Sequence, residues 1–70
     1  MDSKKLKAEM IMHDASVDDI CKAAGFGRSA WFRKISGKSE FTQSEILAIS
    51  QLLDLGQERT LEIFFADVVS

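Results

Sequence analysis

Apolar residues recur along this 70-residue chain at the spacing of α-helices. The strongest repeat is a stripe of four residues, Ile46, Ile49, Leu52 and Leu53. No stretch alternates apolar and polar residues over the length of a strand, and the chain contains no proline. The pattern therefore predicts an all-α domain, a compact bundle of about five short helices that spans residues 1–70.

Local signals place the first two helices. The first is predicted over about residues 3–13, and Asp14 can end it because aspartate tolerates a left-handed backbone better than most residues. Ser16 is expected to cap the second helix, whose first turn holds acidic side chains that favour the positive end of the helix dipole. Gly25 is expected to end this helix, because glycine accepts a positive φ without a steric penalty.

A tight turn follows at Gly25-Phe26-Gly27, and a third helix is predicted over about residues 28–35. Trp31 and Ile35 lie on one face of that helix and are expected to pack in the core. Two short helices joined by a glycine-containing turn of three or four residues have the geometry of a helix-turn-helix. We therefore expect this motif over about residues 16–37.

The fourth helix has the best-marked start. Thr42 and Glu45 match a capping box of the type T-x-x-E. Phe41 and Ile46 stand at the two positions of a hydrophobic staple. Gly56 is expected to end this helix, since it follows the last residue of the apolar stripe.

The C-terminal third carries more apolar surface than a short terminal helix needs to dock on its own domain. A fifth helix is predicted from Gln57 to about Phe65, and the structure of residues 66–70 stays open. We expect a homodimer held by the apolar side chains of this segment, Leu61, Phe64, Phe65, Val68 and Val69. The alternative is that the first three complete the core of a single chain while the two valines fray.

Basic residues concentrate in the middle of the chain, although the whole chain has a net charge of −2. Residues 22–39 hold five basic side chains and no acidic one: Lys22, Arg28, Arg33, Lys34 and Lys38. Residues 40–70 hold a single basic side chain against six acidic ones. A basic middle between acidic flanks is typical of a domain that presents one face to a polyanion.

Several classes of function find no support in the sequence. No apolar run is long enough to cross a bilayer, and the charged start MDSKKLKAEM lacks the apolar stretch of a secretory signal. The only cysteine, Cys21, and the only histidine, His13, give no metal-ligand spacing. No G-x-S-x-G or P-loop motif occurs. We therefore expect a cytoplasmic protein that is not an enzyme and needs no metal, cofactor or small-molecule ligand.

The predicted helix-turn-helix resembles a known superfamily at several positions. Ile20 and the small Cys21 stand where that family places an apolar residue followed by a small one, and Gly25 stands at the turn glycine. The segment RSAWFRKI at 28–35 is similar to the recognition helix R-S-T-F-Y-R-K-L, and Gly37-Lys38 is similar to the N-G-K that ends it. The chain thus resembles the lambda-repressor-like (Cro/CI, XRE) superfamily, especially small transcriptional regulators from phages and prophages of Gram-positive bacteria.

This resemblance implies sequence-specific binding to duplex DNA, the operator of a repressor, with the third helix in the major groove. The candidates for base contacts are its outward side chains, Arg28, Ser29, Phe32 and Arg33. The candidates for phosphate contacts are Lys22, Lys34, Ser36, Lys38 and Ser39. Many family members have Gln-Glu-Glu where this chain has Val17, Asp18 and Asp19, so the phosphate contact of that glutamine is missing.

Three points stay open at this level. Phe32 can contact a thymine methyl group, or it can lean on the fourth helix as part of the core. Arg28 and Arg33 can also be ordinary surface arginines. The fold itself can serve as a protein-interaction module, such as an antirepressor or an antitoxin-like partner, and the acidic Asp18 and Asp19 favour that alternative.

Overall fold

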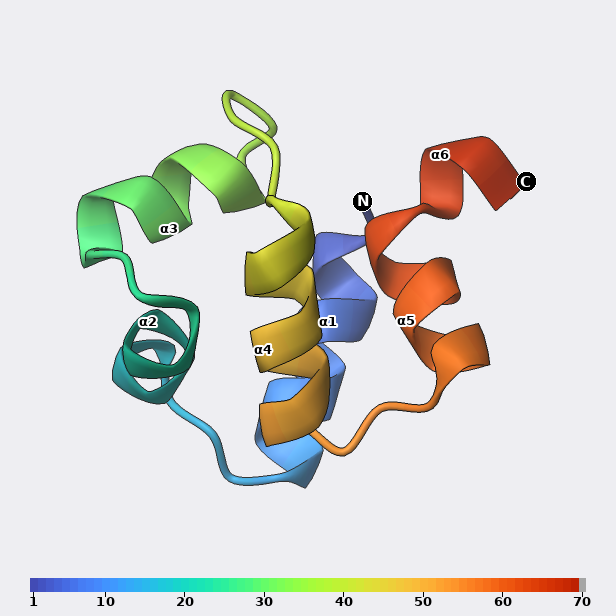
Figure 1. Cartoon of the computed structure of the whole chain (residues 1–70), viewed down its shortest axis with the longest axis horizontal. Helices are drawn as coiled ribbons and strands as arrows, with labels where there is room; N and C mark the ends of the chain where they lie inside the picture. The colour runs from blue at the N-terminus through green and yellow to red at the C-terminus, as the bar shows by residue number, and fades with distance from the viewer. Residues whose placement is uncertain (70) are drawn as a thin grey trace.

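The computed structural model describes the backbone of residues 1–69 and the side-chain environments of residues 1–67, and it is all-helical (Figure 1). Five helices of eight to ten residues are followed by a one-turn helix: α1 Ser3–Met12, α2 Val17–Ala24, α3 Arg28–Ile35, α4 Gln43–Leu52, α5 Gln57–Phe64 and α6 Ala66–Val69. No strand occurs within residues 1–69. The predicted fold class, a small all-α bundle, is confirmed, and no described helix is long and apolar enough to cross a membrane.

The helix ends follow the local signals closely in the first half of the chain. Asp14 has a φ of +54° directly after α1, and Gly25 has a φ of +83° after α2. The Ser16 hydroxyl accepts a hydrogen bond from the Asp19 amide at 3.1 Å. The Asp19 carboxylate in turn accepts one from the Ser16 amide at 2.9 Å. Asp19 therefore completes a capping box at the start of α2, where only the serine cap was predicted.

The two ends of α4 differ in how well they were predicted. The capping box of Thr42 and Glu45 is present as expected. The prediction that Gly56 ends the helix is wrong, because α4 ends at Leu52 and Gly56 caps the start of α5. Asp54 takes the left-handed conformation instead, with a φ of +51°, as Asp14 does after α1. Aspartate can terminate a helix in this way without a glycine.

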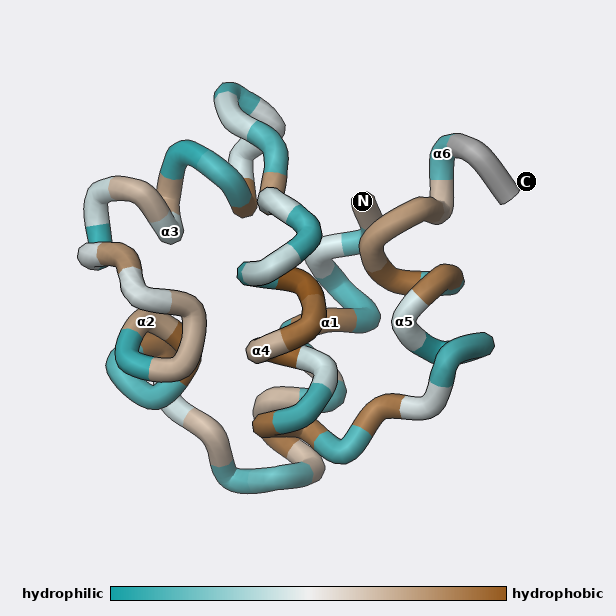
Figure 2. The backbone as a smooth tube through the Cα atoms, viewed as in Figure 1, coloured by the Kyte–Doolittle hydropathy of each residue, from teal (hydrophilic) through white to brown (hydrophobic). Residues whose placement is uncertain are grey.

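The core forms where α2 packs on α3 and α4, and where α5 packs on α1 and α4. Its fully buried side chains come from four helices and the residue that follows α4: Leu6, Ile20, Ile49, Leu53 and Ile63. Figure 2 shows hydrophobic and hydrophilic positions interspersed in α4 and α5, as amphipathic helices require. Leu52, which the apolar stripe of α4 was expected to turn inward, is instead 41% exposed.

An aromatic cluster fixes α3 to the rest of the bundle. Phe41, in the loop before α4, lies 6.3 Å from Trp31 and 5.3 Å from Phe64 between ring centroids, both in edge-to-face geometry. Its centroid is also 6.3 Å from that of Phe26, in the turn before α3. Trp31 is buried, as predicted. Because α3 is only two turns long, this packing sets its orientation.

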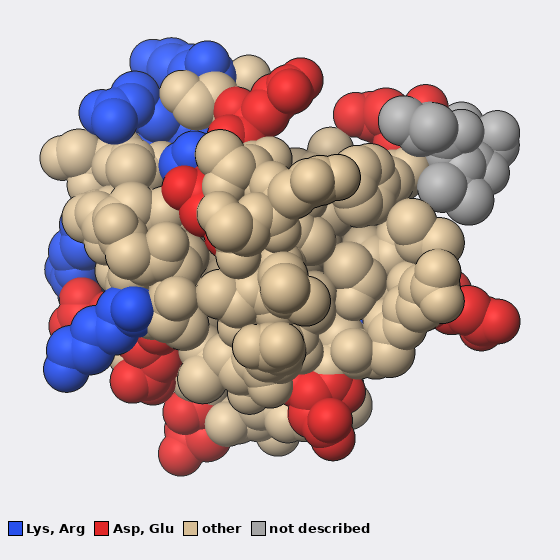
Figure 3. All heavy atoms as spheres, viewed as in Figure 1, with Lys and Arg blue, Asp and Glu red and all other residues tan. Residues whose placement is uncertain are grey.

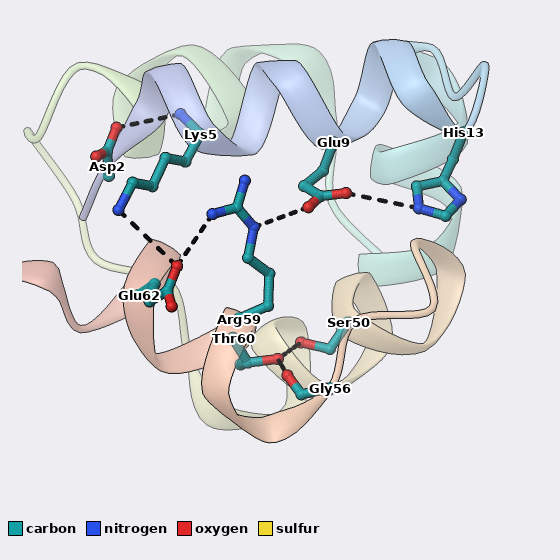
Figure 4. A network of polar contacts seen from close by, with 9 residues as sticks. All are labelled: Asp2, Lys5, Glu9, His13, Ser50, Gly56, Arg59, Thr60 and Glu62. Atoms are coloured by element: carbon teal, nitrogen blue, oxygen red, sulfur yellow. Dashed lines mark hydrogen bonds and ion pairs between the residues drawn. The ribbon is translucent and has the colours of Figure 1, made fainter.

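A polar network joins α5 to α1 on the other side of the core (Figure 4). Arg59 donates from Nε to the buried Glu9 carboxylate at 2.8 Å and from Nη1 to Glu62 at 3.0 Å. These two hydrogen bonds raise the pKa of Arg59 above its ordinary value. The Thr60 hydroxyl donates to Ser50 of α4 at 3.0 Å. Within the described part of the chain, every buried side-chain nitrogen and oxygen has a hydrogen-bond partner.

Candidate nucleic-acid interface

Helix α3 presents one face to solvent and the other to the core. Trp31 and Ile35 lie on the inner side, as expected, although Ile35 is only half-buried. The outer side carries exposed residues at helical spacing, Arg28, Ser29, Phe32, Arg33 and Ser36. All four candidates for base contacts are therefore accessible to a ligand.

Phe32 is the largest exposed side chain on this face. It is 60% exposed, so the alternative that it leans on α4 within the core is wrong. A phenylalanine with most of its surface exposed adds little to core packing and leaves apolar surface in water. Its position one turn after Arg28 and one turn before Ser36 places it in the middle of the outer face.

Exposed basic side chains surround α3. Arg28 and Arg33 lie on the helix itself, Lys22 lies on α2, and Lys38 lies in the loop that follows α3. Figure 3 shows Lys and Arg gathered along the edge of the molecule that α3 and this loop form. Residues 22–39 contribute no acid to this edge, and Asp18 of α2 is the acidic side chain that pairs with Arg28 there.

Lys34 does not belong to that surface, and its assignment as a phosphate contact is corrected. Its Nζ lies 3.0 Å from the Glu45 carboxylate, and its side chain is only 12% exposed. The ammonium group also lies 5.5 Å and 5.7 Å from the ring centroids of Phe26 and Phe41. Burial alone would raise the pKa of Glu45, but hydrogen bonds from the Thr42 amide and from Lys34 bring it below its ordinary value. Lys34 therefore ties α3 to α4.

The loop after α3 brings two other candidates to the surface. Gly37 has a φ of +87°, a conformation that favours glycine. The exposed Ser36 donates from its hydroxyl to the Arg33 carbonyl oxygen at 3.1 Å, and the Lys38 amide donates to the same oxygen at 2.9 Å. Ser39 is half-buried. Ser36 and Lys38 are thus accessible at the end of α3.

Arg28 is held by an acidic residue of α2. Its Nε donates to the Asp18 carboxylate at 2.9 Å, and both side chains are more than 60% exposed. The structure shows no hydrogen-bond partner for the two Nη groups of Arg28 among the described residues. One edge of the guanidinium group is therefore oriented by the protein while its Nη groups remain available to a ligand.

The amino end of α2 is capped by side chains of the same chain, Ser16 and Asp19. The Asp19 carboxylate accepts a hydrogen bond from the Ser16 amide at 2.9 Å, and this bond is the main cause that lowers the pKa of Asp19 below its ordinary value. A negative charge is therefore fixed at the amino end of α2. Lys22 is the basic side chain that α2 exposes on this side of the surface.

The residues predicted to form a dimer interface divide into three groups. Phe64 is buried against Phe41, so its assignment to an interface is wrong. Leu61 and Phe65 line an open groove between α4 and α5. The side chains of Val68 and Val69 lie outside the described residues. The groove also contains Leu47, which is 60% exposed and which the apolar stripe of α4 did not include.

Comparisons with known proteins found no matching family model and no significantly similar curated protein or solved structure. The arrangement of the side chains is therefore the basis for a functional assignment. Within the described residues, no three His, Cys, Asp or Glu side chains are grouped so that they can hold a metal ion. The most distinctive surface is the basic outer face of α3.

Proposed function

We propose that this chain binds double-stranded DNA in a sequence-dependent manner, as a transcriptional regulator of the lambda-repressor-like type. The observation that supports this most is the outer face of α3, on which Arg28, Phe32 and Arg33 are exposed. An α-helix fits the major groove of B-DNA, where each base pair presents a distinct pattern of donors and acceptors.

The exposed residues of α3 divide into roles by their chemistry. Arg28 and Arg33 match the two acceptors of guanine, O6 and N7, which a guanidinium group binds in a bidentate manner. Ser29 can donate to or accept from several bases, and Phe32 can contact the methyl group of thymine. Lys22 and Lys38 flank the helix and match phosphate groups, which set the register of the protein on the duplex.

The number of base pairs that one chain reads is small. The eight residues of α3 span about 12 Å at 1.5 Å per residue, which corresponds to three or four base pairs. Such a short site gives little specificity among the competing sites of a genome. Two chains on a symmetric operator would read two half-sites about 34 Å apart.

A salt titration of binding to random duplex DNA, followed by fluorescence anisotropy, tests the proposal. If three or four phosphate charges are neutralised, the logarithm of the binding constant should fall with the logarithm of salt at a slope of about −3. Lys38→Ala should make this slope less steep by about 1. Lys7→Ala is the matched control, because Lys7 is an exposed lysine on α1, outside the proposed surface.

Absence of binding at low salt by folded protein would contradict the proposal and favour the alternative, a protein-interaction module. Asp18 and Asp19 are the residues that favour that alternative. The DNA-binding interpretation accounts for both of them, since Asp18 pairs with Arg28 and Asp19 caps α2.

A further inference from the structure

Phe32 is an exposed aromatic residue that lies among basic side chains. The other large apolar residues that are exposed in the described chain lie on α1, α4 and α5: Ile11, Met12, Leu47, Leu52 and Leu61. Phe32 stands instead between Arg28 and Arg33 on α3, and it takes no part in the aromatic cluster around Phe41. A phenyl ring in this setting fits a ligand that is anionic overall and apolar at one point.

The geometry of α3 places the Phe32 ring between the two arginines around the helix as well. At 3.6 residues per turn, each residue is rotated by about 100° from the one before it. Phe32 is therefore about 40° around the helix from Arg28, and Arg33 is about 100° further in the same direction. The exposed Ser29 and Ser36 also fall between the arginines. The middle of the outer face thus consists of one phenyl ring and two small hydroxyl side chains, with an arginine at each edge.

We propose that Phe32 reads the C5-methyl group of a pyrimidine in the major groove, either thymine or 5-methylcytosine, close to the guanine bound by Arg28. This inference rests on the proposed DNA binding and specifies what the middle of the α3 face recognises. Phe32 lies four residues beyond Arg28, or about 6 Å along the helix axis, which corresponds to about two base pairs. The methyl group is therefore expected within about two base pairs of that guanine.

The edges of the bases explain why a phenyl ring selects a methyl group. In the major groove a purine presents its N7 acceptor together with O6 or the N6 amino group, and cytosine presents its N4 amino group. A ring placed over any of these groups displaces water and returns no hydrogen bond, which weakens binding. The C5-methyl group is the apolar group on these edges, and its contact with Phe32 removes apolar surface of both partners from water.

The same reasoning makes binding sensitive to the methylation of cytosine. The methyl group of 5-methylcytosine is attached to the same ring carbon as that of thymine, so the two occupy equivalent places in the major groove. Unmethylated cytosine has only a hydrogen atom there. Burial of one methyl group corresponds to about a fourfold change in affinity. We therefore expect a site with 5-methylcytosine at this position to bind about fourfold more tightly than the same site with cytosine.

Exchange of thymine for deoxyuridine tests the inference, because both pair with adenine and they differ only in the methyl group. A preferred site is selected from a random duplex library, and each of its thymines is then replaced by deoxyuridine in turn. Fluorescence anisotropy should show a position at which the replacement lowers affinity about fourfold. In a second arm, the T·A pair at that position is replaced by C·G with the cytosine either methylated or unmethylated, and the methylated duplex should bind more tightly.

Phe32→Ala should remove both effects, so that thymine and deoxyuridine duplexes bind equally. Phe32→Leu keeps an apolar side chain and should keep a smaller preference for the methylated duplexes. Leu47→Ala is the matched control, because Leu47 is also 60% exposed but lies on α4, and it should leave the preference unchanged. Thermal melts followed by circular dichroism establish that the variants fold, which is expected because both positions are exposed.

The results separate this inference from the proposed function. If the protein binds its selected site but tolerates every deoxyuridine replacement, the methyl contact is overturned while DNA binding stands. Equal affinity for the cytosine and 5-methylcytosine duplexes overturns the inference in the same way. A thymine preference that persists in Phe32→Ala also overturns it, because another residue would then read the methyl group. Folded protein that binds no DNA overturns both proposals.

Discussion

Asp18 is an acidic side chain next to the surface that we propose binds DNA. Its replacement should lower the discrimination between sequences and, separately, reduce the electrostatic repulsion of DNA. In the structure it orients Arg28, whose Nε donates to it at 2.9 Å. In the proposed complex it would also place a negative charge near the DNA backbone. Asp18→Ala should therefore reduce discrimination between sequences and increase affinity for DNA that lacks the preferred site.

The loss of discrimination follows from the freedom that Arg28 regains. An arginine side chain carries about 2 kcal/mol of rotamer entropy, and its pairing with Asp18 restricts part of that freedom before DNA binds. Because both side chains are largely exposed, the pair orients Arg28 only partially. We expect a loss of about 0.5–1 kcal/mol, or about two- to fivefold, out of the 1–3 kcal/mol that a bidentate guanine contact supplies.

The gain in affinity follows from the repulsion between the Asp18 carboxylate and the DNA phosphates. A carboxylate about 10 Å from a phosphate is repelled by about 0.4 kcal/mol in water, and 0.1 M salt reduces this to about 0.15 kcal/mol. With two or three phosphates at such distances, removal of the charge should raise affinity about twofold. The stability of the fold should change by less than about 1 kcal/mol, because Asp18 and Arg28 form an exposed ion pair.

The assay compares binding to a site selected from a random library with binding to its scrambled sequence. Asp18→Asn keeps an oxygen that can accept from Arg28 but loses the charge, so it should keep the discrimination and gain the affinity. Glu58→Ala removes one acidic charge from α5 and should change neither quantity. The reasoning is refuted if Asp18→Ala discriminates between the two sequences as well as the wild type does.

Further predictions concern α3 and its packing. Arg33→Ala should relax sequence preference by about 1–3 kcal/mol if the guanidinium binds a guanine, whereas equal losses on selected and scrambled DNA would make Arg33 a phosphate contact. Trp31→Ala should lower the free energy of unfolding by about 3–5 kcal/mol, measured by urea denaturation, because Trp31 is buried against Phe41. The lowered pKa of Glu45 means that its carboxylate stabilises the fold above its ordinary pKa of 4.5, and that this contribution is lost as pH falls through the lower folded value. Glu45→Gln should therefore lose less stability than the wild type when urea denaturation is repeated from about pH 5 down to about pH 3, and an unchanged pH profile would contradict the assignment.

The helix ends could be predicted from the sequence because their chemistry is local. A capping box such as Thr42 and Glu45 needs only residues three apart, and Gly25 needs only its own backbone freedom. The error at Gly56 arose because two termination signals stand close together. Asp54 comes first in the chain and can take a positive φ, so α4 ends before it and leaves Gly56 to cap α5.

The direction of individual apolar side chains was harder to predict, because it depends on the neighbouring helices. In α5, Phe64 is buried and Leu61 is partly exposed, although both were expected at a dimer interface, and the fully buried Ile63 was not singled out. In α4, Leu47 is exposed at the groove while Ile49 is fully buried. Each helix has neighbours on more than one side, so a single apolar stripe does not define which residues are covered. The groove therefore became visible only in the folded chain.

The exposure of individual charged residues was also not predictable from the sequence, as Lys34 and Lys38 show. They stand four residues apart in one acid-free segment, and the sequence gives no reason to treat them differently. In the fold, Lys34 pairs with Glu45 at the start of α4, eleven positions further along the chain, and its side chain is only 12% exposed. Lys38 instead lies in the exposed loop after α3. The ammonium group of Lys34 is compensated by a carboxylate and two aromatic rings, so it contributes to the packing of α3 and adds little to the field at the surface. The positive charge that the proposed surface offers is therefore smaller than the composition of residues 22–39 indicates. Because the salt dependence of binding reports how many phosphates are neutralised, it tests this charge directly.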